Sequence, residues 1–455
     1  MATMKTEFNR ASEISFDEEH WQKMNYSTSC YERNFAKGKV NYRNMELEKQ
    51  RAYNMSNKAL FNLEKLLVDF ETHFNENGGK VLWARDAADA RTLIFDLLMR
   101  ERIGTVARTH STILDEIDIN AFLEKKNIKL FETNVDRFAL KTNNIKSYHP
   151  LSPALQLSKE ECNALLNNAF KLKLDSTPKQ MVNFVRYKVN ESLKQVGACL
   201  TGANFLLSDE GGVVFTENEG NILKASTEAK IHIVVAGIAK VIPTMDDLGI
   251  LLPLLSSHAT GQSMAAFNSI SFGPAKNGRN PQQMYVILLN NDRSELLSHE
   301  RQRKMMSCIH CGACVSVCPV YKNIGGHAYA TDYVGPMGSV MIPLMHGLKE
   351  YEYLASACSL CGRCSEVCPV KIPLDDLIIE NRHLIATERV GDAKLEAMFK
   401  LMVWHCKSRK KMDAPLFIKK VELKRFINQQ SFGERRELPE FAPKSFSQWW
   451  KERKA

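Results

Sequence analysis

The chain has 455 residues, of which 44% are hydrophobic and 25% are charged, and its formal net charge is +9. This length exceeds a single ordinary core, so we expect two or three folded units, and the composition excludes wholesale disorder. The polar opening lacks the apolar core of a signal peptide. The longest apolar run, from Leu248 to Leu255, is far shorter than the ~20 residues that span a bilayer. We therefore expect a cytoplasmic protein.

The positive charge is concentrated at the end of the chain. From Lys400 to Ala455 there are 15 Lys and Arg residues against 6 Asp and Glu residues, whereas the rest of the chain has 46 of each kind. Such a tail can attract an acidic partner or an anionic membrane surface, or it can be the solvated basic face of a helix. No DNA-binding or RNA-binding motif accompanies the charge, so nucleic acid is not an expected partner.

The first part of the chain divides into an irregular segment and a helix. No periodic pattern marks the first residues, and we predict that the segment 1–43 is irregular. From Asn44 to Asn77, apolar residues recur at spacings of three and four, which predicts an amphipathic helix that ends at Gly78 and Gly79.

Beyond this helix, short apolar runs alternate with helical patterns as far as Asn290. The predicted strands are 80–84, 105–107, 128–131, 231–236 and 285–289, and a predicted hairpin joins 204–207 to 213–216. The predicted helices between them cover about 86–102, 114–126, 178–195 and 245–257. Alternation of this kind predicts an α/β domain with a largely parallel sheet over residues 44–293.

The strand-like runs stop at Ser294. Helical patterns from there onward predict an all-helical domain over residues 294–401 that carries both compact groups of cysteines. The remainder, 402–455, is predicted to be a basic C-terminal extension.

Eight of the twelve cysteines form two similar runs. The first is Cys-Ile-His-Cys-Gly-Ala-Cys-Val-Ser-Val-Cys-Pro, beginning at Cys308, and the second is Cys-Ser-Leu-Cys-Gly-Arg-Cys-Ser-Glu-Val-Cys-Pro, beginning at Cys358. Both match the C-x₂-C-x₂-C-x₃-C-P run of two-cluster bacterial ferredoxins. This ferredoxin-like repeat predicts two [4Fe–4S] clusters and a role in electron transport.

The spacing also predicts the ligands of each cluster. In this motif three cysteines of a run bind one cluster and the fourth cysteine binds the other. Cluster 1 is therefore assigned to Cys308, Cys311, Cys314 and Cys368, and cluster 2 to Cys358, Cys361, Cys364 and Cys318. Gly312 and Gly362 allow the backbone to turn where a side chain would crowd the cluster.

Structural zinc is the alternative for these cysteines, but zinc takes four ligands per site and does not need two identical runs. His310 and His327 lie beside the first run, where they either donate hydrogen bonds to cluster sulfur or simply pack. The four scattered cysteines are expected to be small buried side chains and not ligands: Cys30, Cys162, Cys199 and Cys406.

The α/β half offers a weaker indication of a binding site. Glycine-rich turns follow several of its predicted strands, and such turns can direct backbone N–H groups at an anion or a nucleotide. No dinucleotide-binding or P-loop pattern follows a strand here. A ligand in this cleft would lie near Arg108, Asn204 and Asn221.

From Asn44 to the C-terminus the chain resembles the lactate-utilization iron–sulfur proteins, the B subunits of a bacterial three-protein system that oxidises L-lactate to pyruvate. Besides the cysteine runs, the resemblance is carried by Thr201–Phe205, Asn218–Asn221, Val241–Thr244, Leu251–Leu255, Ala259–Gln262, Gly325–Tyr329, Lys371–Pro373 and the ending Phe441–Phe446 with Trp449 and Trp450. The chain departs from the family pattern in the α/β half, at Arg108–Thr112, Glu132–Arg137, Pro153–Gln156 and Ile222–Leu223.

The resemblance implies an α/β LUD domain, related to sugar-isomerase and CoA-transferase folds, followed by a helical ferredoxin domain. It implies two partners, a cysteine-rich redox subunit and a small LUD-domain subunit. The clusters of this chain would relay electrons out of lactate oxidation. In that reading the eight cysteines are its functional residues, and none of its residues is catalytic.

Three functions stay open. The first is a non-catalytic electron-transfer subunit of a complex that oxidises L-lactate or another small hydroxy acid. The second is an enzyme with its own substrate site in the α/β cleft and with the clusters as electron acceptors. The third is a structural or sensory protein whose clusters stabilise a scaffold or report oxidation.

Overall fold

The computed structural model of the chain describes residues 3–143, 145, 147–388, 390, 393–408, 444 and 446–454. The chain forms two compact units, Met1–Arg382 and His383–Ala455. The first unit contains a mixed α/β region with a parallel sheet, followed by a helical region that carries both cysteine runs. The predicted fold class is therefore confirmed, and the α/β and cysteine-bearing regions belong to one compact unit.

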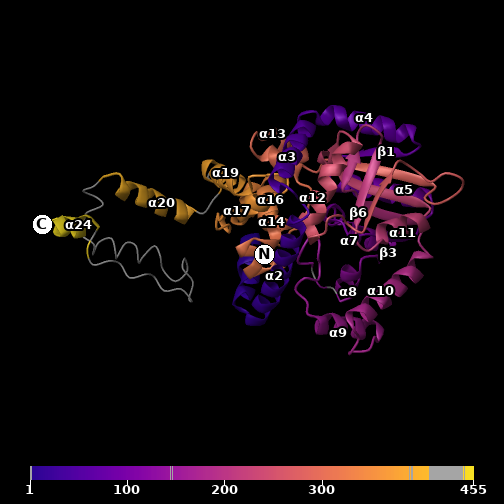
Figure 1. Cartoon of the computed structure of the whole chain (residues 1–455), viewed down its shortest axis with the longest axis horizontal. Coiled ribbons are helices and arrows are strands. Elements are labelled where there is room, and N and C mark those ends of the chain that lie inside the picture. The colour runs from indigo at the N-terminus through magenta and orange to yellow at the C-terminus, as the bar shows by residue number, and fades with distance from the viewer. Residues whose placement is uncertain are drawn as a thin grey trace. The chain divides into compact units, whose positions relative to one another are not determined.

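A six-stranded parallel sheet forms the centre of the α/β region (Figure 1). Its strands in spatial order are β1 (Lys80–Ala84), β10 (Gln283–Leu289), β7 (Ile231–Gly237), β4 (Ala198–Gly202), β2 (Thr105–Arg108) and β3 (Lys129–Glu132). Five of these were predicted, whereas β4 was not, because its small residues and terminal glycine give no apolar run.

Helices cover both faces of this sheet, since successive residues of a strand point to opposite sides. Ile233 of β7 packs with α5 (Ala87–Arg100) and α7 (Ile119–Lys125) on one face. Val234 packs on the other face with α4 (Leu63–Glu76). Because the sheet is buried on both faces, its central strands are almost entirely apolar.

The other helices of this region are α3 (Met45–Phe61), α6 (Thr112–Glu116), α8 (Val135–Thr142), α9 (Lys159–Phe170), α10 (Pro178–Leu193), α11 (Asn221–Glu228) and α12 (Leu248–Thr260), with short 3₁₀ turns η2 (Ile238–Lys240) and η3 (Met245–Asp247).

Two of the helices predicted from the sequence are each divided into two helices. The helix expected over 44–77 becomes α3 and α4, because Asn62 leaves helical geometry with φ −108° and ψ 20°. The helix expected over 114–126 becomes α6 and α7, because Asp118 takes a φ of 46°.

A second sheet of four strands packs beside the first. Its strands in spatial order are β8 (Val241–Ile242), β5 (Phe205–Leu207), β6 (Gly212–Glu217) and β9 (Phe267–Ser271). β5 and β6 are antiparallel with Leu206 opposite Val213, which confirms the predicted hairpin. Its turn uses Gly211 at a φ of +63°, where an added Cβ would strike the backbone of α4.

The cysteine-bearing region is helical. Its elements are α13 (Arg293–Ser298), η4 (Gln302–Ser307), α14 (Ala313–Ser316), α15 (Pro319–Ile324), η5 (Gly326–Tyr329), α16 (Gly335–His346), α17 (Leu348–Ser356), α18 (Arg363–Val367) and α19 (Leu374–Thr387). No strand occurs between residues 294 and 388, so the predicted helical character of this region is confirmed.

The segment 1–43 is helical, and the prediction that it is irregular is wrong. It forms α1 (Met4–Ser12), η1 (Glu13–Phe16) and α2 (Glu18–Lys39). Figure 1 shows α2 beside the orange helices of the cysteine-bearing region, and α2 contacts both α15 and α12. The buried side of α2 is formed by His20, Met24, Thr28 and Gly38. Only one of these is a large apolar residue, so the sequence shows no apolar periodicity.

The second unit is described only in part. Its helices are α20 (Ala393–Cys406) and α24 (Phe446–Lys454), so the predicted boundary at residue 401 falls within α20. Most of the predicted basic extension, 402–455, lies outside the described residues.

Gly261, directly after α12, provides a test of how α2 packs on the α/β region. Its φ is +77°, and an added Cβ would strike the backbone oxygen of Asn34 in α2. We expect Gly261→Ala to lower the free energy of unfolding by about 2–4 kcal/mol, from backbone strain and the clash together. Gly249→Ala in α12 is the matched control, because an added Cβ there meets nothing within 4 Å. Urea titration followed by tryptophan fluorescence measures both, and equal effects of the two variants would contradict this packing.

His232 of β7 provides a test that depends on pH. It is 2% exposed, its Nε2 lies 2.8 Å from the Thr201 hydroxyl, and burial lowers its pKa to about 3. In the unfolded chain a histidine titrates near pH 6.5, so below ~6.5 the unfolded chain binds a proton that the folded chain does not. Stability therefore falls as pH falls towards the folded pKa.

Between about pH 7.5 and 5.5, we expect the wild-type chain to lose about 1.4 kcal/mol more unfolding free energy than His232→Gln. Urea titrations at the two pH values measure this difference. An identical loss in both proteins would show that His232 is not held uncharged.

Candidate functional site

Both cysteine runs adopt the same local structure. The first turns through His310 and Gly312 before α14, and the second turns through Leu360 and Gly362 before α18. The φ angles of these four residues are 57°, 70°, 54° and 75°. An added Cβ at Gly312 would also lie 3.0 Å from the His149 ring. Glycine is therefore required there for its backbone angle and for the close approach of a neighbour.

The thiols of the first run are electrostatically coupled to the last cysteine of the second. Burial raises the pKa of Cys311, and Cys368 and Cys308 raise it further. Burial also raises the pKa of Cys314, with further contributions in decreasing order from Cys308, Cys311, Cys368 and Cys364. Each negative thiolate opposes ionisation of the next. We call Cys308, Cys311, Cys314 and Cys368 the first group of thiols, and Cys314 is also coupled to Cys364 of the second run.

A second group contains the last cysteine of the first run. Burial raises the pKa of Cys318 to about 11, with contributions from Cys358 and Cys361. Burial raises the pKa of Cys364 to about 12, with Cys318 the next largest contributor that raises it. The fourth cysteine of each run is thus electrostatically coupled to thiols of the other run.

The chemistry of this donor set suits iron–sulfur clusters. Four thiols per group is the protein complement of a [4Fe–4S] cluster. The backbone N–H of His310 donates to Cys308 Sγ at 3.4 Å, and that of Leu360 donates to Cys358 Sγ at 3.3 Å, as expected for sulfur that carries negative charge. Among the described residues, no three His, Cys, Asp or Glu side chains are arranged to hold a single metal ion.

A cationic side chain donates a hydrogen bond to the backbone oxygen of the first cysteine of each run. Lys240 Nζ donates to the backbone oxygen of Cys308 at 3.3 Å, and Arg382 Nη2 donates to that of Cys358 at 2.6 Å. Arg382 comes from α19 beside the second run, whereas Lys240 comes from the loop after β7, in the α/β region. Loss of surrounding water lowers the pKa of Lys240 to about 8, so it remains largely charged at neutral pH.

The two runs differ in exposure. Cys361 is exposed, and so are its neighbours Ser359 and Arg363. In the first run Cys311 is buried and no cysteine is exposed. The second group of thiols therefore lies nearer to solvent than the first.

A cavity of about 300 Å³ lies where the strands of the main sheet end. It is lined by the residues that follow β2, β4 and β7, and also by Cys308 and His310 of the first cysteine run. The carboxyl ends of parallel strands are the usual ligand-binding edge of α/β folds. We call it the strand-end cavity. It joins the α/β region directly to the first cysteine run.

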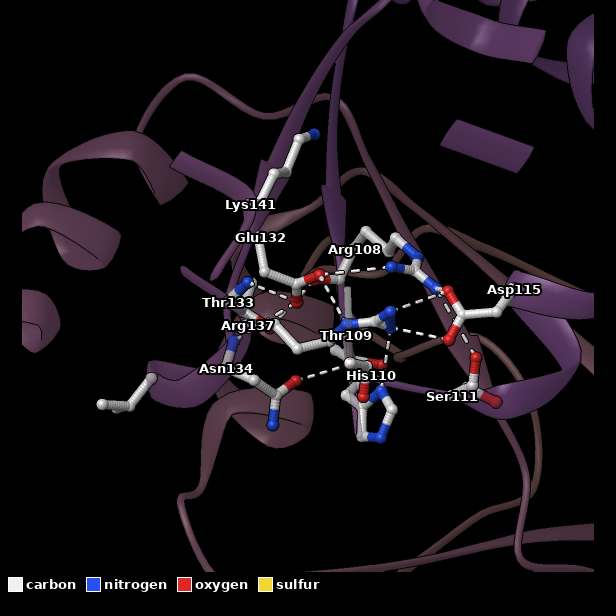
Figure 2. A network of polar contacts seen from close by, with 12 residues as sticks. Arg108, Thr109, His110, Ser111, Asp115, Glu132, Thr133, Asn134, Arg137 and Lys141 are labelled. Atoms are coloured by element: carbon white, nitrogen blue, oxygen red, sulfur yellow. Dashed lines mark hydrogen bonds and ion pairs between the residues drawn. The ribbon is translucent and has the colours of Figure 1, made fainter. Parts of the chain in front are cut away.

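Of the three cleft residues predicted from the sequence, two line the strand-end cavity and one does not. Asn204 and Asn221 line the strand-end cavity, whereas Arg108 does not. Arg108 is 1% exposed and belongs to the network in Figure 2, where it donates to Asp115 at 2.5 Å and to Glu132 at 3.2 Å. Its charge is therefore already neutralised.

Arg137 completes this network by donating to Asp115 at 2.6 Å (Figure 2). The positive charges of two arginines thus balance the negative charges of two carboxylates near the ends of β2 and β3. The network also orients the adjacent loop, because the His110 N–H donates to Asn134 Oδ1. It supports one wall of the strand-end cavity, which both His110 and Asn134 line.

A buried ion pair joins the α/β region to the cysteine-bearing region. Arg293 Nη1 and Nη2 donate to the two carboxylate oxygens of Glu116 at 2.8 and 2.7 Å. The Tyr333 hydroxyl donates to the same carboxylate at 2.5 Å. Burial by itself would raise the pKa of Glu116, but Arg293, Tyr333 and Asn291 together outweigh burial and hold that pKa below its usual value. Both charged side chains are therefore ionised and paired.

The histidines beside the first run have different surroundings. The ring of His310 lines the strand-end cavity, with its centre 5.9 Å from that of Tyr333. Burial, with the positive charges of Lys240 and Arg293, lowers the pKa of His310 well below its usual value. His327 stacks on Tyr148 at 4.8 Å. The packing role expected for His327 is consistent with this contact.

The expectation for the scattered cysteines holds for one of them. Cys199 is fully buried on β4. Cys30 and Cys162 are partly exposed and Cys406 is exposed, so the prediction of burial is wrong for these three. A single small apolar residue does not determine which side of a helix is buried.

Sequence reasoning missed Lys240, Arg382, Arg293 and Glu116. A lone lysine, arginine or glutamate outside a motif gives no sign of what it will contact. One usable indication was present, since Lys240 comes soon after a largely apolar strand and therefore falls at the ligand-binding edge of the sheet.

Comparison with known families agrees with this architecture. Residues 67–289 match the LUD domain, and residues 304–372 match the 4Fe-4S dicluster domain. A solved structure of a DUF162 family protein from Deinococcus radiodurans is 12% identical, with a TM-score of 0.29 over 50% of this chain and 98% of that one.

Two relatives are similar over most of their length. The uncharacterized electron transport protein YkgF of Escherichia coli (strain K12) is 32% identical over 90% of this chain and 88% of its own. Lactate utilization protein B of Bacillus cereus (strain AH820) is 32% identical over 74% of this chain and 71% of its own. The chain therefore belongs to the family of electron-transport proteins, lactate utilization protein B among them, that combine a LUD domain with a 4Fe-4S dicluster domain.

Proposed function

We propose that this chain is the electron-transfer subunit of a complex that oxidises L-lactate to pyruvate, and that it holds two [4Fe–4S] clusters. The observation that supports the proposal is that the two cysteine runs fold alike, with Cys368 electrostatically coupled to the first run and Cys318 to the second. The name of lactate utilization protein B supports lactate as the substrate of the complex. Another small hydroxy acid is the alternative, since the chain departs from the family pattern in its α/β half.

Each cluster takes three ligands from one run and one from the other. Cluster 1 is assigned to Cys308, Cys311, Cys314 and Cys368, and cluster 2 to Cys358, Cys361, Cys364 and Cys318. When bound, a [4Fe–4S] cluster accepts and releases single electrons. The protein itself supplies the thiolates, the N–H donors to sulfur and the two cations on the first cysteine of each run.

The difference in exposure indicates which cluster would face another protein. Cluster 2 would be held by the exposed Cys361, so it would be the cluster that exchanges electrons with a partner. Cluster 1 would be held by Cys308, which lines the strand-end cavity. The proposed protein partners are a cysteine-rich redox subunit and a small LUD-domain subunit of the same system.

The proposed location of the protein is the cytoplasm. None of the described helices has the length and apolar character needed to cross a membrane. The basic extension that could contact an acidic partner or a membrane surface lies mostly outside the described residues.

A second candidate function is favoured by one observation. The strand-end cavity reaches Cys308, so a small molecule bound there would lie against the loop that holds cluster 1. The chain would then bind a substrate itself and use the clusters as electron acceptors. Turnover by the purified chain without partners distinguishes this function from a pure relay.

The cluster content can be tested directly. We expect anaerobically purified protein to contain about eight irons and eight sulfides per chain. Dithionite reduction should produce the EPR signal of two interacting reduced clusters. One cluster, or zinc in place of iron, would contradict the proposed function.

The exchange of the fourth ligand can be tested by pairs of cysteine variants. Cys308→Ser and Cys368→Ser should alter one and the same cluster signal in the EPR spectrum, and Cys318→Ser and Cys358→Ser should alter the other. Cys406→Ser is the control, because Cys406 is exposed and belongs to neither group. If Cys308→Ser and Cys318→Ser affected the same cluster, each run would hold its own cluster and the assignment would be wrong.

A further inference from the structure

The strand-end cavity has no role in a simple electron relay, which needs only clusters and a protein partner. The cavity nevertheless lies at the ligand-binding edge of the sheet and reaches both Cys308 and His310. Anything bound there is within the electrostatic range of cluster 1. The polar groups in its wall indicate which kind of molecule it accepts.

Lys240 is the cation of this wall that has no carboxylate partner among the described residues. Its Nζ donates to a backbone oxygen, that of Cys308, at 3.3 Å. The other cation of the wall, Arg293, is already paired with Glu116. A single unpaired ammonium favours a ligand with one negative charge.

Neutral donors stand beside this ammonium in the same wall. Asn204 Oδ1 accepts from the Thr216 N–H at 2.8 Å, which directs its amide oxygen into the protein and leaves its NH₂ group as the donor for a ligand. Ser111 precedes α6 without a side-chain capping bond, so its hydroxyl is also available.

Two carboxylates also line the cavity, but both are held by the chain. Glu217 accepts from the N–H groups of Ile222 and Leu223 at 2.8 and 3.0 Å. Glu219 accepts from the Val135 N–H at 3.1 Å, and burial raises its pKa. These bonds reduce their repulsion of an anion.

The remainder of the wall is largely apolar, with Val235, Met306, Ile309 and Met341 among its residues. Apolar surface suits the carbon skeleton of an organic ligand and does not suit a fully hydrated inorganic ion. One ammonium without a carboxylate partner, neutral donors and apolar walls, with both wall carboxylates hydrogen-bonded to the chain, together fit a small organic acid.

We propose that the strand-end cavity binds a small organic monocarboxylate, whose carboxylate pairs with Lys240, and that the bound anion lowers the reduction potential of cluster 1 relative to cluster 2. This rests on the proposed function, because cluster 1 must be present for its potential to change. The unpaired ammonium of Lys240 favours the more negative, reduced cluster. An anion beside it cancels that effect.

The second cysteine run provides an internal control. Arg382 occupies the equivalent place on Cys358 but does not line the cavity. A ligand in the cavity therefore leaves the cation of cluster 2 unchanged. Occupancy of the cavity thus changes the difference in potential between the clusters, which decides how readily an electron passes from cluster 1 to cluster 2.

Binding is tested by calorimetry on anaerobic holoprotein with sodium L-lactate, sodium pyruvate and inorganic phosphate as separate probes. We expect a carboxylate to bind and Lys240→Met to weaken it about tenfold or more, through loss of a charge-assisted hydrogen bond. Lys230→Met is the matched control, because Lys230 pairs with Glu101 away from the cavity. Unchanged affinity in Lys240→Met, tighter binding of phosphate, or no binding of either carboxylate overturns the proposal.

A second variant covers the case in which Lys240→Met does not fold. Asn204→Asp keeps the oxygen that accepts from Thr216 but replaces the donor NH₂ with a negative oxygen, so it should weaken binding of the carboxylate. Unchanged binding in this variant would also place the ligand elsewhere.

The electrostatic effect is tested by EPR-monitored redox titration, with the two clusters distinguished by the cysteine variants described above. Saturating carboxylate should shift the potential of cluster 1 to more negative values and leave that of cluster 2 in place. Lys240→Met should have the lower potential already, with no further shift. Equal shifts in the potentials of both clusters, or no shift in either, overturn the proposal. Iron analysis would still show two clusters in that case, so the proposed electron relay does not fail with this inference.

Discussion

The buried ion pair between Arg293 and Glu116 is the contact on which the arrangement of this protein depends. It is bidentate, both side chains are almost fully buried, and Tyr333 adds a third hydrogen bond to the same carboxylate. Arg293 begins the cysteine-bearing region, whereas Glu116 ends α6 of the α/β region. A buried charge that loses its partner typically costs 3–5 kcal/mol. The two regions are therefore held together where the strand-end cavity meets the first cysteine run.

This junction explains why the two cysteine runs, so similar in sequence, have different surroundings. The first run faces the α/β region, and its cation Lys240 comes from the loop after β7. The second faces solvent, and its cation Arg382 comes from the neighbouring α19. The same local motif thus occurs once against the α/β region and once at the surface of the protein.

The segments expected to depart from the family pattern include two arginines whose charges are balanced inside the protein. Arg108 and Arg137 pair with Asp115 and Glu132 in a buried network (Figure 2). Arg108 does not line the strand-end cavity, and the expectation of a ligand near it stays a prediction. The cation that remains available at the strand ends is Lys240. A charge can attract a ligand only if the protein has not already neutralised it.

The sequence by itself determined the alternation of strands and helices, the hairpin of β5 and β6, and the eight cysteines, because each depends on spacing along the chain. It did not reveal α1 and α2, since the buried side of α2 consists mainly of polar residues and glycine. Nor did it reveal the pairing of Arg293 with Glu116, or the approach of Lys240 to Cys308, which join residues 177 and 68 positions apart. The sequence does not indicate which partner a single charged residue will contact. Only the folded chain decides which charges are paired, and so which one is left for a ligand.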